Sequence, residues 1–292
     1  MSIQTNCELP LCLMDKNEEL NNYDFVLFHL FESNKTYREY FLNLRKSNPT
    51  RLMILDNSAY EFYIKGESLD LNKYADTIKL LKPDVYILPD VLMDMEKTVQ
   101  ITKAFWSEFV LQLPDSKPMA VLQGRTPDQL MECLNVYKGM NINHIAIPFH
   151  NDFFWDLGFD IDSTTRKAFD KWHGMRGMSK DTYYAKDTYY AMGRIKFLHD
   201  NHKNILDGIK HLHFLGSHDP FEKTIYNMLT IGSVGMTFTM DTGYPVKCGI
   251  KGVQLGKEKT KPEVIIDEFL DKNLSEPTKR CIINNVTIFR DL

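Results

Sequence analysis

The sequence predicts an α/β fold, a (β/α)8 barrel of the TIM type formed by one domain over residues 1–292. Helical patterns separate most of the short apolar stretches, which favours a parallel sheet, and their number favours a barrel over an open sheet. Four stretches end in polar residues, as a barrel needs in order to build a site at one rim: Asp56, Asp90, Gln123 and Asp241. The eight stretches lie near residues 8–14, 25–31, 52–56, 85–89, 119–123, 144–148, 211–215 and 234–240.

In the first half of the chain, apolar residues at helical spacing lie between the expected strands. Asp70 is a suitable N-cap for one of these helices, and Pro83 follows its end, directly before the strand that leads to Asp90. A helix–strand alternation therefore runs through this half. The expected helices are 35–45, 71–81, 96–113 and 127–138.

The second half begins with a different segment, residues 149–210, which has aromatic, glycine and charged residues but no strand alternation. We expect an insertion there, between strands six and seven. It contains the tandem hexapeptide KDTYYAKDTYYA, Lys180–Ala191, whose tyrosines offer either stacking surfaces for bases or a partly buried helix face. Helices are expected at 220–229 and near 263–270, followed by a short tail at 271–292.

Composition is that of an ordinary globular protein, with 43% hydrophobic and 25% charged residues. No apolar run approaches the roughly 18 residues of a membrane span, and the start MSIQTNCELP lacks the features of a signal peptide. We therefore expect no membrane partner and a cytoplasmic location, which would be the host cytoplasm for a phage protein. Oligomeric state is left open.

Cofactor and metal signals are weak, and we expect neither. The cysteines, Cys7, Cys12, Cys133, Cys248 and Cys281, are scattered, and only the spacing of the first two hints at a metal. His211 and His213 alternate on one expected strand, without a third ligand at a persuasive position, and we expect them to be structural or to lie at the rim. No GxGxxG or GxxxxGK[ST] motif supports an open nucleotide-binding sheet.

The stretch around Asp241 is central because a strand rich in Val, Thr and Phe stops there at the turn Thr-Gly-Tyr-Pro. Carboxylates crowded at one rim repel each other, which raises the pKa of at least one. Two carboxylates in unlike surroundings can then divide the roles of nucleophile and acid/base. The competing interpretation is that each Asp caps a helix after its strand.

Nucleic acid would have to bind through local clusters of cations, because the net charge is −4. Two clusters are candidates for contacts to phosphates, although a lysine-rich loop can also simply be solvated. The first consists of Arg194, Lys196 and Lys203, and the second of Lys247, Lys251, Lys257, Lys259 and Lys261.

These motifs resemble the tRNA-guanine transglycosylases, and most closely their shortened phage-type relatives that insert 7-deazaguanines into DNA. The likeness covers roughly residues 50–250, in the family's order. The matching segments are ILDNSAY at 54–60, LPDVLMD at 88–94 with Thr98, VLQG at 121–124, HFLG at 213–216 with Pro220 and Glu222, and DTGYP at 241–245.

The resemblance implies roles for individual residues. Asp241 would be the nucleophile, Asp56 the acid/base, and Asp90 with Gln123 the groups that hold the guanine edge. The chain departs from the tRNA enzymes in having no clustered cysteines for zinc, and Ile147 and Pro148 stand where paired glycines approach the base. With Gly216, these two residues complete the expected base site.

The resemblance further implies guanine exchange for a 7-deazaguanine base by double displacement through an Asp-linked intermediate. The missing zinc cluster and the short length favour DNA over tRNA as the acceptor. Three alternatives stay open: a tRNA-guanine transglycosylase, a sugar-processing barrel that uses Asp56 and Asp241 as its carboxylate pair, and a non-catalytic barrel that binds nucleic acid or serves as a partner subunit.

Overall fold

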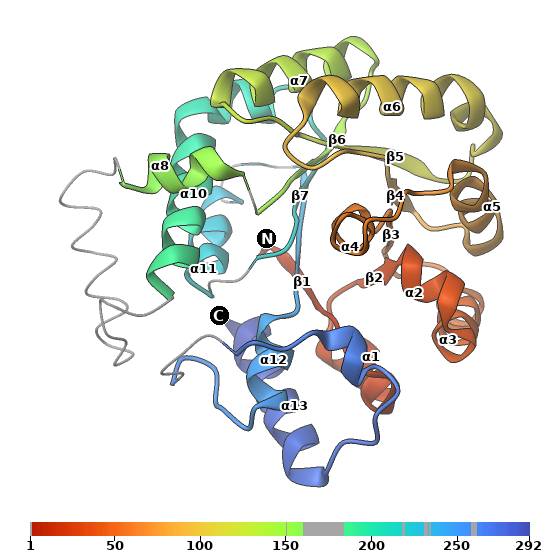
Figure 1. Cartoon of the computed structure of the whole chain (residues 1–292), viewed down its shortest axis with the longest axis vertical. Helices are drawn as coiled ribbons and strands as arrows, with labels where there is room; N and C mark the ends of the chain where they lie inside the picture. The colour runs from red at the N-terminus through yellow and green to blue at the C-terminus, as the bar shows by residue number, and fades with distance from the viewer. Residues whose placement is uncertain are drawn as a thin grey trace.

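A nearly closed barrel of eight parallel strands forms the centre of the molecule, in the order β1-β8-β7-β6-β5-β4-β3-β2 (Figure 1). The computed structural model describes residues 2–149, 151–159, 184–217, 220–230, 233, 235–257 and 262–292. The predicted (β/α)8 fold is confirmed. The strands are β1 Gln4–Cys7, β2 Asp24–Leu27, β3 Met53–Asp56, β4 Val85–Ile87, β5 Lys117–Val121, β6 His144–Ile147, β7 His211–Phe214 and β8 Thr237–Thr242.

Asparagine side chains close the barrel between β1 and β2, the two ends of the strand order. Asn21 mimics a strand neighbour, because its amide accepts from the Cys7 N–H at 2.8 Å and donates to the Cys7 carbonyl at 3.0 Å. Asn22 accepts from the Thr5 N–H at 3.0 Å. These bonds satisfy backbone groups of β1 that a ladder would otherwise pair.

Helices surround the barrel, with α6 and α7 along one side and α12 and α13 on the opposite side in Figure 1. Asp70 caps α5 as predicted, accepting from the N–H groups of Asn72 and Lys73. The α-helices are α1 Asn17–Leu20, α2 Phe28–Ser33, α3 Lys35–Ser47, α4 Ala59–Lys65, α5 Leu71–Leu81, α6 Met95–Phe109, α7 Pro127–Gly139, α8 Asp152–Phe159, α10 Tyr184–Leu206, α11 Pro220–Leu229, α12 Tyr244–Ile250 and α13 Glu276–Asp291. Short 3-10 helices are η1 Leu11–Lys16, η2 Val110–Gln112 and η3 Ile266–Phe269.

Three sequence-based expectations are wrong at the ends of the chain and in its second strand. The first strand lies at 4–7, and much of the expected strand 8–14 is η1. The stretch 25–31 divides into β2 and α2, because a short run that is apolar throughout carries no period that separates strand from helix. The expected tail contains α13, which buries Ile282, Val286 and Phe289 against the rest of the protein.

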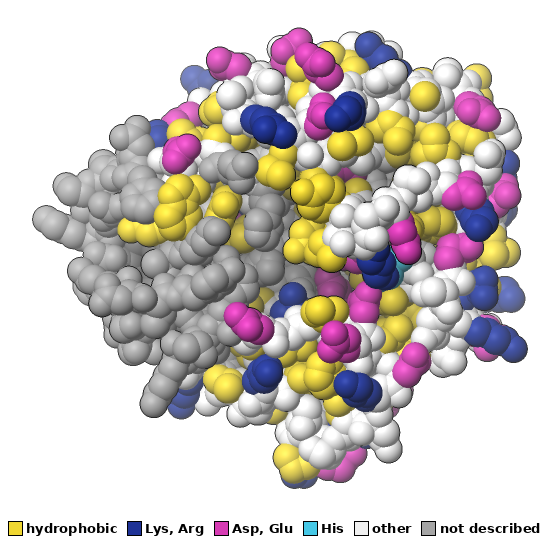
Figure 2. Space-filling model, in the orientation of Figure 1, with side chains coloured by type: hydrophobic (Ala, Val, Ile, Leu, Met, Phe, Trp, Pro, Cys, Tyr) yellow, Lys and Arg dark blue, Asp and Glu magenta, His cyan; other side chains and the backbone are white. Residues whose placement is uncertain are grey.

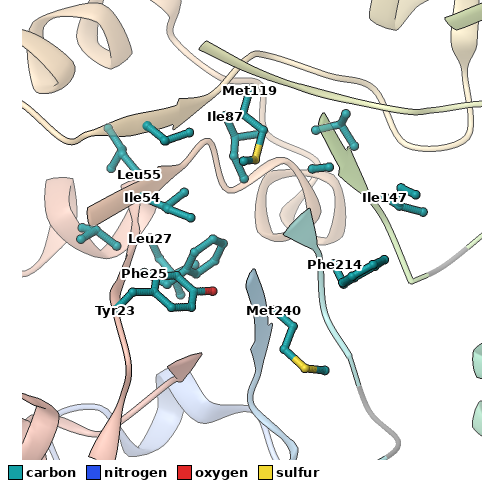
Figure 3. Packing of buried hydrophobic residues seen from close by; sticks show 14 of the residues in the cluster. Tyr23, Phe25, Leu27, Ile54, Leu55, Ile87, Met119, Ile147, Phe214 and Met240 are labelled. Atoms are coloured by element: carbon teal, nitrogen blue, oxygen red, sulfur yellow. The ribbon is translucent and has the colours of Figure 1, made fainter. Parts of the chain in front are cut away.

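The barrel interior has an apolar half and a polar half. Strand residues alternate between the interior and the helix layer, and the pocket at the strand ends is lined by Phe25, Leu27 and Ile87. In Figure 3, Phe25, Ile54, Ile87 and Met119 lie around the same interior space. On β7 and β8 the inward positions are polar, so histidine and threonine side chains lie beneath the rim.

The layer between the strands and the helices is apolar and close-packed. Phe214 of β7 points outward (Figure 3) and stacks on Tyr226 of α11, with ring centroids 3.8 Å apart. Tyr74 of α5 is fully buried, and its hydroxyl donates to the Ile87 carbonyl at 2.7 Å and lies 3.3 Å from the Leu55 carbonyl. These contacts fix α5 against β3 and β4, the strands that carry two of the predicted site residues.

Candidate active site

A pocket of about 220 Å³ opens at the carboxyl ends of the strands, where the sequence predicts a site. Near the centre of the view in Figure 2, hydrophobic and acidic side chains lie together with a basic one, and further Lys and Arg are spread over the rest of the face shown. Asp56, Asp90, Gln123 and Asp241 all line the pocket, so the fold brings together the polar ends of four strands. Pro148 and Gly216 also line it, as expected.

Asp241 lies near the end of β8, and its main chain and side chain are both held in place. Its Oδ1 accepts a hydrogen bond from the Gly216 N–H at 3.0 Å, and its carbonyl accepts from the Ser217 N–H at 3.0 Å. His213 Nε2 lies 3.2 Å from the same Oδ1. Within the described residues, the hydrogen bonds to this carboxylate end on Oδ1, which leaves Oδ2 for a ligand.

Asp56 faces the pocket from the end of β3. Its Oδ2 accepts from the Ser58 N–H at 2.7 Å, in a turn where Ser58 adopts the left-handed conformation with φ 59°. Burial raises the pKa of Asp56 well above its ordinary value, and the negative charge of Glu61 raises it further, outweighing the Ser58 bond. The group is therefore suited to carry and donate a proton near neutral pH.

Asp90 and Gln123 are hydrogen-bonded to each other beside these two carboxylates. Gln123 Nε2 donates to Asp90 Oδ2 at 2.7 Å, and Gln123 Oε1 accepts from the Met93 N–H at 2.9 Å. Asn57 donates to Asp90 Oδ1 at 2.7 Å. Burial raises the pKa of Asp90, whereas these two side-chain hydrogen bonds lower it. The network presents carboxylate acceptors next to an amide donor in a fixed arrangement.

Glu8, Glu61 and Lys247 also line the pocket. Burial raises the pKa of Glu8 to about 8, although the nearby charge of Lys247 opposes the shift. A Cβ at Gly243 would lie 3.2 Å from Glu8 Oε2 and 2.6 Å from Ile266 Cδ1, so a larger residue there would displace these side-chain ends. The sequence did not single out Glu8, because it fell inside the expected strand 8–14.

His29 joins the turn at Ser58 to the carboxyl-terminal segment. Its Nδ1 lies 2.9 Å from Ser58 Oγ, and its Nε2 lies 2.9 Å from Asp267 Oδ2. The hydrogen bond from His29 is the largest effect on Asp267 and lowers its pKa. The turn that positions Asp56 is thus tied to residues more than 200 positions away.

Arg194 is not available to nucleic acid, which corrects the expectation for it. The side chain is fully buried and binds Glu222, with Nη2 2.8 Å from Oε1. It also donates to the carbonyls of Ile147 and Leu215, and to Ser217 Oγ at 2.8 Å. Arg194 therefore clamps the loops that follow β6 and β7, next to Gly216 and Asp241.

Ile147 also differs from the expectation, because it is absent from the residues that line the pocket. Its side chain is buried, and its carbonyl is occupied by Arg194 and by the Leu215 N–H. The residue holds the loop after β6 and leaves the pocket wall to Pro148 and Phe149.

The remaining predicted cations lie in different settings. Lys196 pairs with Asp200 at 2.8 Å, while Lys203, Lys251 and Lys257 are exposed. Lys247 lines the pocket. Lys259 and Lys261 lie outside the described residues, as do Lys180 to Tyr183 of the tandem repeat. The part of the repeat within α10 includes Tyr190, which is buried against Phe149.

The described cysteines are all free thiols, and no three His, Cys, Asp or Glu side chains of the described ranges are grouped as a metal site would need. None of the helices in those ranges combines the length and the apolar character that crossing a bilayer requires. Comparison of the sequence with known protein families and with curated proteins finds no match.

Proposed function

We propose that this chain is a base-exchange glycosyltransferase that replaces guanine by a 7-deazaguanine derivative in nucleic acid, in DNA rather than tRNA. One observation carries the proposal: a single pocket contains a carboxyl group whose pKa is raised, a second carboxylate held by the Gly216 N–H, and an acceptor–donor pair beside them. Asp56, Asp241, and Asp90 with Gln123 are these groups.

Asp90 and Gln123 suit the edge of guanine. A carboxylate can accept about four hydrogen bonds and an amide nitrogen can donate two. After the bonds to Asn57 and to each other, Asp90 keeps acceptor capacity for the base N–H groups, and Gln123 keeps one N–H for the base carbonyl. Because the Met93 N–H fixes the Gln123 amide, the donor stays turned toward the base.

The reaction is a double displacement at the sugar C1′. Asp241 Oδ2 attacks C1′ as the bond from C1′ to guanine breaks, and Asp56 gives its proton to the departing base. The incoming 7-deazaguanine then returns a proton to Asp56, and its nitrogen attacks C1′ while the ester to Asp241 breaks. Two inversions give net retention, and the protons and electrons balance between the two bases and the two carboxyl groups.

The dimensions of the pocket agree with a single base. A cavity of about 220 Å³ lies below the roughly 300–1,000 Å³ of typical drug-sized sites. It suits one flat ring system with its sugar at the mouth, and suits an oligosaccharide poorly. A guanine in a duplex must leave the stack to reach it, so either base flipping or a single-stranded substrate is required.

The test is to incubate the protein with radiolabelled guanine or a labelled 7-deazaguanine, separately with DNA and with tRNA, and to measure label in the polymer. We expect incorporation into DNA, and none with the Asp241→Asn variant. Label in tRNA alone would contradict the choice of acceptor.

Two other outcomes would contradict the exchange reaction itself. Hydrolysis of simple glycosides without guanine exchange would identify a sugar-processing barrel. Tight binding of nucleic acid by wild-type protein, with neither exchange nor hydrolysis, would identify a non-catalytic partner subunit.

A further inference from the structure

Beneath the pocket, the polar half of the barrel interior holds a row of side chains that the reaction above does not use. His211 and His213 of β7 are buried, and so is Thr239 of β8. Thr239 Oγ1 lies 2.7 Å from His211 Nε2 and 2.7 Å from His213 Nδ1. The row ends at the rim, where His213 Nε2 lies 3.2 Å from Oδ1 of Asp241.

The ring of His213 has little freedom to turn. It stacks on Phe25, with centroids 5.2 Å apart and an interplanar angle of 24°, and it forms a T-shaped pair with Tyr23, with centroids 6.4 Å apart. Its Nε2 is fully buried and, among the described residues, has no aligned hydrogen-bond partner although Asp241 is at bonding distance. Such contacts often align only when a substrate is bound.

Proton positions in this row follow from donor counting. Burial lowers the pKa of His211 well below its ordinary value, so His211 carries one ring proton near neutral pH. The Thr239 hydroxyl has a single proton to donate. If His211 Nε2–H donates to Thr239, the hydroxyl donates to His213 Nδ1, and the proton of a neutral His213 is then on Nε2.

The reverse order would place the proton of a neutral His213 on Nδ1 and turn a bare Nε2 lone pair toward a carboxylate oxygen. Two acceptors at 3.2 Å repel each other. The arrangement with the proton on Nε2 avoids this repulsion and is therefore favoured.

We infer that His213 is a positioning residue for the nucleophile: its Nε2–H, fixed by Thr239 and His211, binds Oδ1 of Asp241 and leaves Oδ2 to attack. This inference rests on the proposed function. The same bond helps the second displacement, because negative charge returns to Oδ1 as the ester breaks. The other Oδ1 donor, the Gly216 N–H, comes from the loop after the same strand, so β7 and its loop hold one oxygen from two directions.

The kinetic test uses two amide variants of different reach. In His213→Gln the amide nitrogen occupies the place of Nε2, whereas in His213→Asn it reaches only the place of Nδ1. We expect kcat of the Asn variant to fall about tenfold to a hundredfold, the rate equivalent of one hydrogen bond to a charged group. The KM for the base should stay within about twofold, because the base contacts are elsewhere, and the Gln variant should retain most of the activity. Equal loss in both variants, or a change confined to KM, would overturn the inference.

A spectroscopic test needs no turnover. Long-range proton–nitrogen NMR of protein with ¹⁵N-labelled histidine shows which ring nitrogens carry protons, and the signals of His213 are assigned with the variants. A proton on Nε2 supports the inference, and an unprotonated Nε2 overturns it. If the wild-type protein exchanges no base into any nucleic acid, the proposed function fails while this measurement still decides the position of the proton.

Discussion

At the scale of single residues, Asp56 and Asp241 have the same functional group in one pocket but different surroundings. Asp56 has a raised pKa through burial and the charge of Glu61, whereas Asp241 faces the Gly216 N–H and His213. Environments of this kind separate a proton donor from a nucleophile. The chemical role of each carboxylate therefore depends less on its position at a strand end than on the groups within hydrogen-bond distance of it.

Replacing Asp241 by Asn should abolish exchange and preserve the fold. The amide keeps the size of the side chain and can accept from Gly216, but it cannot form the ester to C1′. We expect turnover to fall roughly a thousandfold or more, measured by incorporation of labelled base, with an unchanged circular dichroism spectrum. Near-normal turnover would refute the assignment of the nucleophile.

Glu8→Gln should stabilise the protein in a pH-dependent manner. Because the folded-state pKa of Glu8 is raised from 4.5 to about 8, the folded protein keeps a proton that the unfolded chain has released, so wild-type stability falls as pH rises between these values. Gln does not titrate. The variant should gain on the order of 1–3 kcal/mol over wild type at pH 8, and almost nothing at pH 4.

Urea unfolding at pH 4, 6 and 8 checks this prediction. Glu67→Gln, at an exposed position, serves as the matched control and should leave the difference from wild type flat with pH. A Glu8→Gln variant whose advantage does not grow between pH 4 and pH 8 would show that Glu8 is ionised in the folded protein.

At the scale of elements, Arg194 and Glu222 connect α10 and α11 to the loops that support Asp241, the proposed nucleophile. Arg194 donates to the carbonyls of Ile147 and Leu215 and to Ser217 Oγ, and the Ser217 N–H donates to the Asp241 carbonyl. A buried guanidinium has five donors in a rigid fork, and this one joins four segments. Its role is therefore architectural.

Arg194→Met should destabilise the protein by about 3–5 kcal/mol, because Glu222 would remain as an uncompensated buried charge. Lys196→Met on the same helix is the control: it breaks a partly exposed pair with Asp200 and should cost less than about 1 kcal/mol. Denaturant unfolding measures both. The double variant Arg194→Met/Glu222→Met should recover part of the stability. If Arg194→Met loses no more stability than Lys196→Met, Arg194 does not hold these segments together.

At the scale of the whole molecule, a net charge of −4 means that affinity for nucleic acid must come from a local group of cations. Lys247 lines the pocket, and Lys251 and Lys257 are exposed on the segment that follows α12. Only α12 separates this segment from the turn that follows Asp241. A nucleic-acid backbone with its base in the pocket would therefore pass close to it.

Replacing Lys257, Lys259 and Lys261 together by Ala should weaken DNA binding and flatten its salt dependence by about one unit of log–log slope for each phosphate that the variant no longer neutralises. Base selectivity should stay unchanged, because phosphate contacts carry no sequence information. Fluorescence anisotropy across a salt series measures the slope.

The control for this experiment replaces Lys35, Lys46 and Lys79, which lie on α3 and α5, and removes the same total charge. Equal effects in both triple variants would mean that net charge alone matters. An unchanged slope in the first variant would remove this segment from the interface.

The sequence by itself determined those helices that are marked by a cap, a proline or an apolar spacing within a few neighbouring residues. The Asp70 cap, the proline at 127 and the apolar spacing of 220–229 predicted helices that the structure confirms nearly to the residue. The strand-to-polar junctions predicted which four side chains meet, because parallel strands in a barrel all end at one rim.

Only the tertiary structure decided which charges are buried and what they contact. Nothing local in the sequence separates Arg194, which is inside the clamp, from Lys203, which is exposed; the difference arises because α11 places Glu222 against α10. Glu8 lines the pocket and His213 lies beneath it, on the strands that flank β8 on either side, and both are more than 20 residues from Asp241 in the sequence. Neighbouring residues in the sequence determine secondary structure and the apolar face of each element. The burial of a charged side chain and its pKa depend on partners that only the fold brings within a few ångströms.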